Sequence, residues 1–358
     1  MNFYQFFRPL IFQLDPEVAH NFAINFLKFC PNAATVFSLN ENYKNLNQNL
    51  WGLDFKSPIG MAAGFDKNAE VALTLEKFGF GFVEAGTVTP QPQIGNDRPR
   101  MFRLCEDEAI INRLGFNNLG AENFAKNIVK ITEKISCPFG INIGKNKDTE
   151  NALNDYLPLL EKFYQKASYI TINISSPNTK NLRDLQKEDQ LDLFLSEIMK
   201  KKNQLKNIHK KNSPILLKLS PDLALSEQEK VAEIVIKNEI DGLIISNTTI
   251  DRNLNLKNKQ AAETGGLSGK PLFIKSNEVL KNFYKLTNGK IPLVGVGGIS
   301  SAKDAYEKIK CGASLVQIYS AFIYQGFGMV ERAKKELSEM VKKDGFENIV
   351  QAVGSRVF

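Results

Sequence analysis

Between residues 58 and 318 eight short apolar segments alternate with longer amphipathic ones. The short segments are rich in β-branched and aromatic residues and predict strands at 58–62, 82–86, 139–143, 169–174, 215–219, 242–246, 293–296 and 315–318. The longer segments predict helices at 68–78, 121–135, 149–167, 189–207, 226–238, 276–286 and 301–310. This pattern predicts an α/β fold, a (β/α)8 or TIM barrel. The count of eight, and the lack of a G-x-G-x-x-G motif at the first helix, disfavour the alternative of an open doubly wound sheet.

The chain is long and apolar enough to bury a full core. With 358 residues, 43% of them hydrophobic, it has room for one barrel and an extension, or for two ordinary domains. Its formal charge of +7 comes from lysines that are spread over predicted helix faces, which argues against a nucleic-acid partner. A solvated basic surface with some attraction for anionic lipid explains the charge as well.

Cysteine and histidine are scarce and scattered. The cysteines form no C-x-x-C pair and lie far apart, at Cys30, Cys105, Cys137 and Cys311. A zinc site, an iron–sulfur cluster and a disulfide framework are therefore disfavoured, and a reducing cytoplasmic setting is expected. With only His20 and His209, a metal centre or a Ser-His-Asp triad is disfavoured too, so the sequence predicts no metal. It also lacks an apolar run long enough to span a membrane and a cleavable signal peptide.

Residues 1–50 precede the first strand and are rich in aromatic side chains. Asp15-Pro16-Glu17 predicts a helix start, so we expect two short helices, at about 3–14 and 16–29, that meet at a tight corner. One face of the second helix carries Val18, Phe22, Phe26 and Phe29. This face either packs on the main domain or stays free for a membrane interface or a lipophilic ligand. The sequence thus divides into a helical hairpin extension, 1–50, and a barrel, 51–358.

Polar residues and glycines follow every predicted strand, at the end where barrel enzymes hold their ligands. The clearest case is the strand at 169–174, which runs into Asn173, Ser176 and Asn178. These side chains suit a flat polar ligand, although a self-contained Asn/Ser/Pro turn explains this segment alone equally well. The other strand ends supply Lys67, Thr87, Asn142, Lys218, Ser246, Asn247, Thr248, Gly298, Tyr319 and Ser320. Burial of such groups without partners would be costly, so the sequence predicts a ligand site at this rim.

Two glycine-rich segments indicate a bound phosphate. Gly297 and Gly298 precede a predicted helix start at 301–304, where free backbone N–H groups would meet the positive end of the helix. The segment 265–269, G-G-L-S-G, adds a second glycine loop. With Lys218 nearby, flavin mononucleotide (FMN) fits better than a sugar phosphate, because a cation stabilises the negative reduced flavin.

Several longer motifs resemble those of class 2 dihydroorotate dehydrogenases, which are quinone-reducing and membrane-associated. In the first third of the chain they are F-Q-L-D-P-E-V-A-H (12–20), A-A-G-F-D-K-N (62–68), E-A-G-T-V-T-P (84–90), P-R-M-F-R-L (99–104) and I-N-R-L-G-F-N-N (111–118). They continue with G-I-N-I-G-K-N-K (140–147), N-I-S-S-P-N-T (173–179), S-N-T-T (246–249), G-G-L-S-G (265–269) and G-V-G-G-I (295–299). Together these motifs span nearly the whole chain.

The resemblance implies oxidation of dihydroorotate to orotate in de novo pyrimidine synthesis, with FMN as hydride acceptor and a membrane quinone as final acceptor. A base must take a proton from substrate carbon 5 while carbon 6 delivers hydride. The resemblance assigns this role to Ser176, where the cytosolic classes carry cysteine. Because serine is a weak base, it must pass its own proton on through a hydrogen bond or water as it acts.

The resemblance also assigns binding residues. The substrate would contact Lys67, Asn112, Arg113, Leu114, Gly115, Phe116, Asn173, Asn178, Asn247 and Thr248, with the 111–116 loop closing over it. FMN would contact Ala63, Gly64, Lys67, Thr87, Asn142, Asn173, Lys218, Ser246, Gly269, Gly298, Tyr319 and Ser320. Ser246 stands where some relatives carry threonine, and either hydroxyl can make the bond.

The extension would give a lipophilic quinone access to the flavin. His20 and Arg103 match positions that line this route in relatives, although an ordinary cap or core histidine also explains His20. The resemblance implies a monomer attached peripherally to a membrane, which in a bacterium would be the cytoplasmic face of the inner membrane.

Two other functions stay open. One is a soluble FMN-dependent barrel dehydrogenase with a non-quinone acceptor, which Ser176 and the extension disfavour. The other is a non-enzymatic membrane-surface protein on a degenerate barrel, which Lys67, Ser176 and Lys218 together disfavour.

Overall fold

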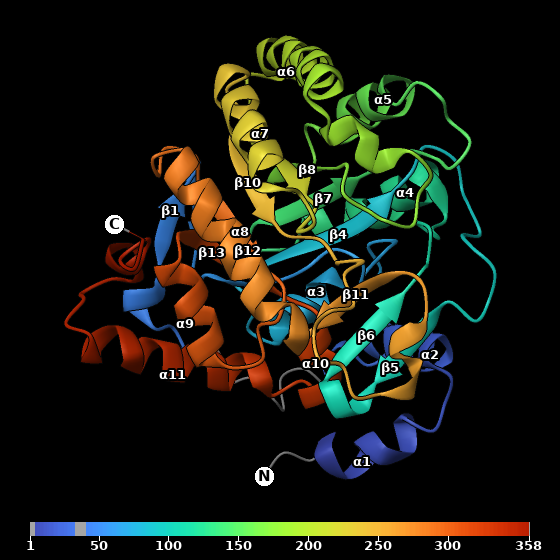
Figure 1. The fold of residues 1–358 in the computed structure, drawn as a ribbon, viewed down its shortest axis with the longest axis vertical. Helices are drawn as coiled ribbons and strands as arrows, with labels where there is room; N and C mark the ends of the chain where they lie inside the picture. The colour runs from blue at the N-terminus through green and yellow to red at the C-terminus, as the bar shows by residue number, and fades with distance from the viewer. Residues whose placement is uncertain (1–3, 33–40, 358) are drawn as a thin grey trace.

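The structure is a computed structural model that describes residues 4–32 and 41–357. Its centre is a closed barrel of eight parallel strands, which confirms the predicted (β/α)8 fold (Figure 1). The strands follow one another around the barrel in chain order, as β3 (Ile59–Met61), β4 (Phe82–Val88), β7 (Phe139–Ile143), β8 (Tyr169–Asn173), β9 (Ile215–Leu219), β10 (Gly242–Ile245), β12 (Leu293–Val296) and β13 (Ala313–Ile318). Every predicted strand is present, and its ends lie within two residues of the predicted ones.

Helices cover the outside of the barrel (Figure 1). The predicted ones are α3 (Ala72–Lys77), α4 (Gly120–Thr132), α5 (Leu153–Phe163), α6 (Glu188–His209), α7 (Leu225–Lys237), α8 (Phe273–Leu286) and α9 (Ala302–Lys310). After the last strand come α10 (Ser320–Gln325) and α11 (Met329–Lys343), which the sequence pattern did not indicate. The helix predicted at 149–167 is shorter at both ends.

The predicted start of the first barrel helix, at residue 68, is wrong. The Asp66 carboxylate accepts hydrogen bonds from the backbone nitrogens of Glu70 (2.7 Å) and Val71 (2.9 Å), and Ala69 has a φ of 56°. These residues therefore form a turn, and helix α3 begins only at Ala72. The turn places Lys67 at the mouth of the barrel instead of beside a helix.

The amino end of the barrel is plugged. A hairpin of two antiparallel strands, β1 (Gln48–Leu50) and β2 (Leu53–Phe55), packs its apolar side chains against residues from inside the barrel. The Phe55 ring lies edge-on to Phe82, 5.5 Å between centroids, and Trp51 Nε1 donates to the Asp241 carbonyl at 2.7 Å. Access to the barrel interior is therefore from the carboxyl end. The division between residues 50 and 51 lies within this hairpin, and we propose that the barrel domain starts before Gln48.

A second sheet, absent from the expectations above, lies at the carboxyl end of the barrel. It consists of β5 (Met101–Leu104), β6 (Ala109–Asn112) and β11 (Gly266–Gly269), all antiparallel. Strand β6 is central and pairs Asn112 with Gly266. The sheet therefore joins the loop after Asn112 to the G-G-L-S-G segment, although the two are far apart in the sequence.

The N-terminal extension is a pair of helices, α1 (Tyr4–Ile11) at the lower edge of Figure 1 and α2 (Pro16–Phe29) above it on the right, beside β5. As predicted, Asp15 caps α2, because its carboxylate accepts hydrogen bonds from the backbone of Glu17 and Val18. Helix α1 ends at Ile11 instead of residue 14, since the chain turns there to enter α2. The expected start of α1, at Phe3, lies outside the described residues.

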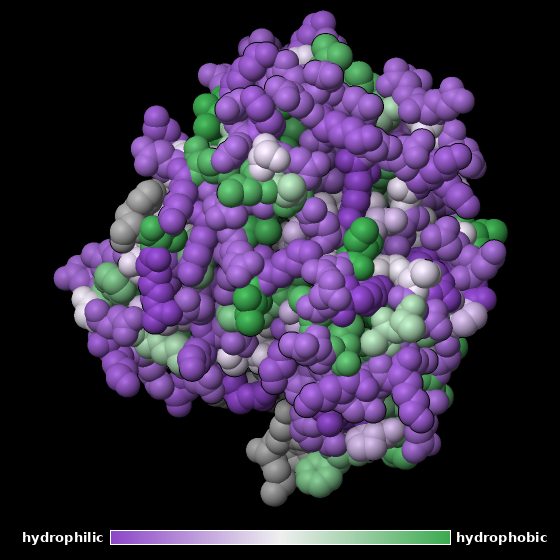
Figure 2. Space-filling view, viewed as in Figure 1, coloured by the Kyte–Doolittle hydropathy of each residue, from purple (hydrophilic) through white to green (hydrophobic). Residues whose placement is uncertain are grey.

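Part of the apolar face of the extension is uncovered. Phe22 and Phe29 on α2 are 61% and 79% exposed, and Phe6 on α1 is 68% exposed. Figure 2 shows a mostly hydrophilic face on which hydrophobic side chains also reach the surface at the lower edge, where α1 lies. Within the residues described, none of the helices combines the length and apolar character needed to cross a bilayer.

Candidate active site at the carboxyl end of the barrel

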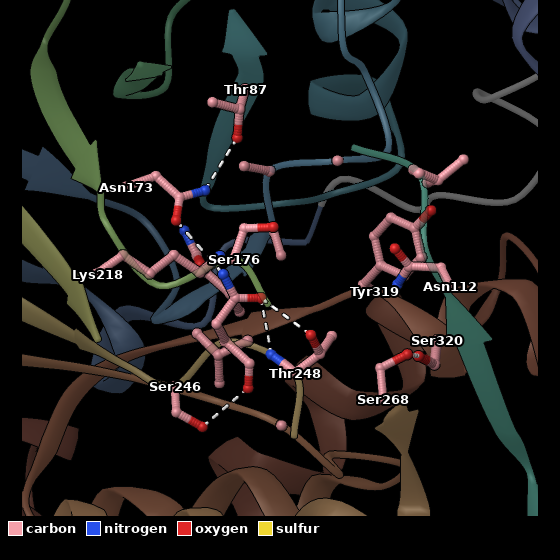
Figure 3. A pocket seen from close by; sticks show the side chains of 18 of the residues that line it. Thr87, Asn112, Asn173, Ser176, Lys218, Ser246, Thr248, Ser268, Tyr319 and Ser320 are labelled. Atoms are coloured by element: carbon pink, nitrogen blue, oxygen red, sulfur yellow. Dashed lines mark hydrogen bonds between the residues drawn. The ribbon is translucent and has the colours of Figure 1, made fainter. Parts of the chain in front are cut away.

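A cavity opens where the predicted polar strand ends meet. Figure 3 shows side chains from strands on opposite sides of the barrel surrounding one space. Of the residues predicted to bind substrate or cofactor, those lining it are Ala63, Gly64, Lys67, Thr87, Asn112, Leu114, Gly115, Phe116, Asn173, Ser176, Asn178, Lys218, Ser246, Asn247, Thr248, Gly269, Gly298, Tyr319 and Ser320. Only Arg113 and Asn142 of those predicted residues do not line it.

Asn142 lies beneath the cavity, fully buried. Its Oδ1 accepts hydrogen bonds from Thr87 Oγ1 (2.6 Å) and Asn173 Nδ2 (3.2 Å), and its Nδ2 donates to Glu84 Oε1 (2.8 Å). Both ends of its amide are thus engaged inside the protein. Asn142 thus orients Thr87 and Asn173, which do line the cavity, and its contact with FMN stays a prediction.

Arg113 points away from the cavity. Its guanidinium donates to Glu263 Oε2 at 2.7 Å and lies over the Phe102 ring, 4.6 Å from the centroid. The side chain thereby fastens the start of the 112–117 loop to the segment before β11. The contact of Arg113 with substrate stays a prediction.

The 112–117 loop is held from several sides. Asn178 Nδ2 donates to the Asn112 carbonyl at 3.0 Å, and Asn96 Nδ2 donates to the Asn178 carbonyl at 3.3 Å. Gln93 Nε2 donates to the Gly115 carbonyl at 2.9 Å. These bonds place Leu114, Gly115 and Phe116 as a cover over one side of the cavity.

Two cationic side chains face the cavity without a partner. Within the described part of the chain, neither Lys67 nor Lys218 forms a hydrogen bond or an ion pair. Burial lowers the pKa of Lys67 to about 8. Burial also lowers the pKa of Lys218, and the nearby charge of Glu84 only partly offsets this. Because an unpaired buried charge is costly, the site fits anionic ligands that would pair with these ammonium groups.

Ser176 lines the same cavity and is 6% exposed. Its Oγ accepts a hydrogen bond from the backbone nitrogen of Asn178 at 3.2 Å. Among the described residues that line the cavity there is no carboxylate and no imidazole. Ser176 offers a hydroxyl group beside the amides that can bind a polar ring.

The phosphate end of the predicted site needs glycine. Gly269 and Gly298 have φ angles of 99° and 77°. A Cβ on Gly298 would lie 2.4 Å from the backbone of Phe273. Each position therefore accepts only a residue without a side chain.

The sequence predicts the start of α9 at the phosphate end of the cavity, but the start of α10 lies there. Ser301 caps α9 through the backbone nitrogen of Asp304, and neither residue lines the cavity. The start of α10 lies there instead, with Ser320 Oγ donating to Ser268 Oγ at 2.9 Å (Figure 3). Ser268 and Gln317 also line the cavity and were missed, although Ser268 lies inside the G-G-L-S-G motif and Gln317 alternates with Tyr319.

A second cavity, of about 430 Å³, lies under the extension. Its walls are almost wholly apolar and come from both helices of the extension and from β5, β6 and α10. His20 and Arg103, the two residues predicted for a quinone route, line it. Arg103 lies 4.6 Å over the Phe12 ring and donates to the Leu14 carbonyl.

A thin aromatic wall separates the two cavities. The Phe65 ring lies edge-on to His20 on one side, 5.4 Å between centroids, and to Tyr319 on the other, 6.2 Å. Burial holds the pKa of His20 well below its usual value, and the charge of Lys67 adds to this effect. The imidazole is therefore neutral at pH 7, as an apolar surrounding requires.

A family model, curated relatives and solved structures all indicate the same family. The model of the dihydroorotate dehydrogenase family matches residues 45–341. Relatives called dihydroorotate dehydrogenase (quinone) include one from Vibrio parahaemolyticus, 48% identical over 93% of this chain and 99% of its own, and one from Rhodopseudomonas palustris, 45% identical over 97% and 94%. The crystal structure of DHODH from Eimeria tenella in complex with ferulenol is similar with a TM-score of 0.89, at 38% identity over 96% of both chains.

Proposed function

The chain belongs to the dihydroorotate dehydrogenase family, and on that premise we propose roles for the residues of its two cavities. It oxidises dihydroorotate to orotate, a reaction of pyrimidine synthesis, with a quinone as the final electron acceptor. The family carries a flavin, which we propose to be FMN in this chain. The observation that carries the assignment of roles is the pair of unpartnered lysines, half-buried Lys67 and buried Lys218, that face one cavity with Ser176.

FMN would be held along the side of the cavity formed by Lys218, Gly269, Gly298 and Ser320. When bound, it supplies a hydride acceptor beside the substrate and passes the electrons on to the quinone. Lys218 supplies the positive charge that a reduced flavin needs in a buried site. Gly269 and Gly298 line this side of the cavity with bare backbone, because a Cβ at either position would meet the backbone of Glu108 or Phe273.

Dihydroorotate would lie against Ser176 and the amides around it. Lys67 would pair with its carboxylate, and the side chains that can hydrogen-bond its ring are Asn112, Asn173, Asn178, Asn247 and Thr248. Ser176 would accept the proton from carbon 5 and give up its own hydroxyl proton as it does so. The cover formed by Leu114–Phe116 would exclude water from this step.

The quinone would occupy the apolar cavity under the extension. Its volume and almost wholly apolar walls suit a lipophilic ring and part of its tail, and Arg103 and His20 supply the few polar groups near it. The exposed aromatics Phe22 and Phe29 would lie in the membrane interface, so that the quinone enters directly from the lipid. We propose that the chain is a peripheral membrane protein, on the cytoplasmic side of the cell membrane in a bacterium. Since a single chain supplies both cavities, a monomer would suffice.

An anaerobic absorbance experiment tests these roles. The purified protein should show a flavin spectrum that dihydroorotate bleaches and a soluble quinone restores. A protein that binds no FMN, or whose FMN is not bleached by dihydroorotate, would contradict the proposed occupancy of the barrel cavity. Bleaching without recovery on quinone addition would contradict the role of the second cavity only.

A further inference from the structure

We propose that Arg183, which does not line the cavity, is a positioning residue that fixes the strand ends around the substrate. It lies in a short 3-10 helix, η4 (Leu182–Gln186), that follows β8. Its guanidinium makes three hydrogen bonds with separate nitrogens. Nε donates to the Ser175 carbonyl at 3.0 Å, Nη2 to the Thr248 carbonyl at 2.9 Å, and Nη1 to Asp222 Oδ2 at 2.9 Å.

The three acceptors follow three consecutive strands of the barrel. Ser175 follows β8 and is the residue before Ser176, Asp222 follows β9, and Thr248 follows β10. Ser176 and Thr248 are both residues to which the proposed function gives direct contact with the substrate. One planar group thus sets the distance between the proposed base and a proposed substrate ligand.

Asp222 makes the arginine rigid. Its carboxylate also accepts hydrogen bonds from Thr249 Oγ1 and from the Ile250 nitrogen at 3.0 Å, and it forms an ion pair with Lys275 at 2.9 Å. Burial alone would raise the pKa of Asp222, but these bonds and the one from Arg183 hold it below its usual value. The carboxylate is therefore charged at neutral pH, and the pair stays formed.

The geometry needs arginine in particular. The side chains of Arg183 and Asp222 are only 22% and 15% exposed, so a lost bond leaves a carbonyl poorly solvated. Lysine at position 183 would keep the charge, but its single ammonium group cannot span three acceptors in one plane. Misplacement of reacting groups by about 1 Å can slow a reaction by about a hundredfold.

The inference rests on the proposed role of Ser176, and rapid-mixing kinetics can test it in the FMN-loaded protein. The rate of flavin bleaching by dihydroorotate and the rate of flavin reoxidation by a soluble quinone are measured separately. In Arg183→Lys we expect bleaching to slow by roughly ten- to a hundredfold, with FMN content and reoxidation within about twofold of wild type. Guanidinium added to Arg183→Ala should restore part of the bleaching rate.

Lys202→Met is the matched control. Lys202 forms an ion pair of similar burial with Asp241, 2.6 Å apart, but at the amino end of the barrel. Loss of a buried ion pair by itself predicts equal bleaching rates in this variant and in Arg183→Ala without added guanidinium. That result, or an unchanged rate in Arg183→Lys, would overturn the proposal.

A second variant, Asp222→Asn, keeps the proposal testable if Arg183→Lys does not bind FMN. If Arg183→Lys does not hold the cofactor, Asp222→Asn keeps the arginine and removes only its anchor, so bleaching should slow by roughly three- to tenfold. An unchanged bleaching rate in Asp222→Asn would then overturn the proposal. A wild-type protein that dihydroorotate does not bleach contradicts the proposed function instead, whatever the variants do.

Discussion

Glu84 and Asn142 are joined inside the barrel by a hydrogen bond of 2.8 Å, from Asn142 Nδ2 to Glu84 Oε1. The other carboxylate oxygen accepts from Gln317 Nε2 at 2.8 Å and from Tyr169 Oη at 3.1 Å. Because the buried Glu84 carboxylate can only accept, the Asn142 amide must turn its nitrogen toward Glu84 and its oxygen toward Thr87 and Asn173. Thr87 and Asn173 therefore both donate to Asn142.

Removal of this carboxylate should destabilise the fold. Glu84→Ala leaves three buried donors without an acceptor, and we expect it to lower the free energy of unfolding by roughly 3 kcal/mol. Glu84→Gln should cost about 1 kcal/mol, because the Gln317 amide can turn and offer its oxygen, which lacks a partner among the described residues. Denaturant titration measures both values. Equal losses in the two variants would contradict this account.

Replacement of the proposed base should stop one half-reaction only. We expect Ser176→Ala to bind FMN and to slow its bleaching by dihydroorotate by roughly a hundredfold or more. Chemically reduced flavin in the same variant should be reoxidised by quinone at the wild-type rate, because Ser176 does not line the second cavity. Rapid bleaching of Ser176→Ala would show that another group takes the proton.

Binding of an anionic ligand should depend on the charge of Lys67. Because its pKa is lowered to about 8, the side chain loses its proton as the pH rises through that value. The affinity for orotate should be nearly constant below about pH 7 and fall by about tenfold per pH unit well above 8. Spectral titration of the bound flavin measures it. Lys67→Met should bind weakly without this pH dependence, and an identical pH profile in the two proteins would refute the role of Lys67.

Alanine at Gly298 should expel the cofactor. The new Cβ would meet the Phe273 backbone, so we expect a loss of at least about 2 kcal/mol of stability and weaker FMN retention. Gly345→Ala is the control, since Gly345 has a similar φ of 83° with nothing within 4 Å of a Cβ. It should cost about 1 kcal/mol and retain FMN. Loss of FMN from both variants would mean that the backbone strain, not the phosphate site, decides retention.

The exposed aromatics of the extension should govern membrane binding. Phe29 does not line the quinone cavity, so Phe29→Ser should leave flavin bleaching unchanged while weakening vesicle binding by roughly tenfold. Leu193→Ser, on α6 and 71% exposed in the native chain, is the matched control and should bind vesicles as the wild type does. Co-sedimentation with anionic vesicles distinguishes the two. Equal binding of all three proteins would contradict a membrane role for this face.

The barrel could be predicted because its signals are local. Each strand is a short, mostly apolar run, and the turn at its end follows within a few positions, as at 169–178. The sheet formed by β5, β6 and β11 has no such local signal, because strand β6 at 109–112 pairs with strand β11 at 266–269, far away in the sequence. Only the closed barrel brings these segments together.

The position of the cavity could be predicted for a similar reason. The predicted strand-end residues other than Asn142 line one cavity, since parallel strands point their carboxyl ends the same way. The direction of Arg113 could not be predicted, because it depends on Glu263, which comes from the segment before β11. The orientation of the Asn142 amide could not be predicted either, because it depends on a hydrogen bond with Glu84. The strand pattern indicates only that Glu84 is a charged residue in a buried strand.

The pairing of Asn112 with Gly266 has a thermodynamic consequence. It joins the substrate loop and the glycine segment in one antiparallel ribbon. A ligand that orders one of the two segments therefore also restricts the motion of the other. Occupancy of the cofactor site should therefore tighten orotate binding, and by reciprocity orotate should slow the escape of the cofactor by the same free energy. In the cell, the enzyme would then be protected from losing its prosthetic group whenever pyrimidine intermediates are plentiful.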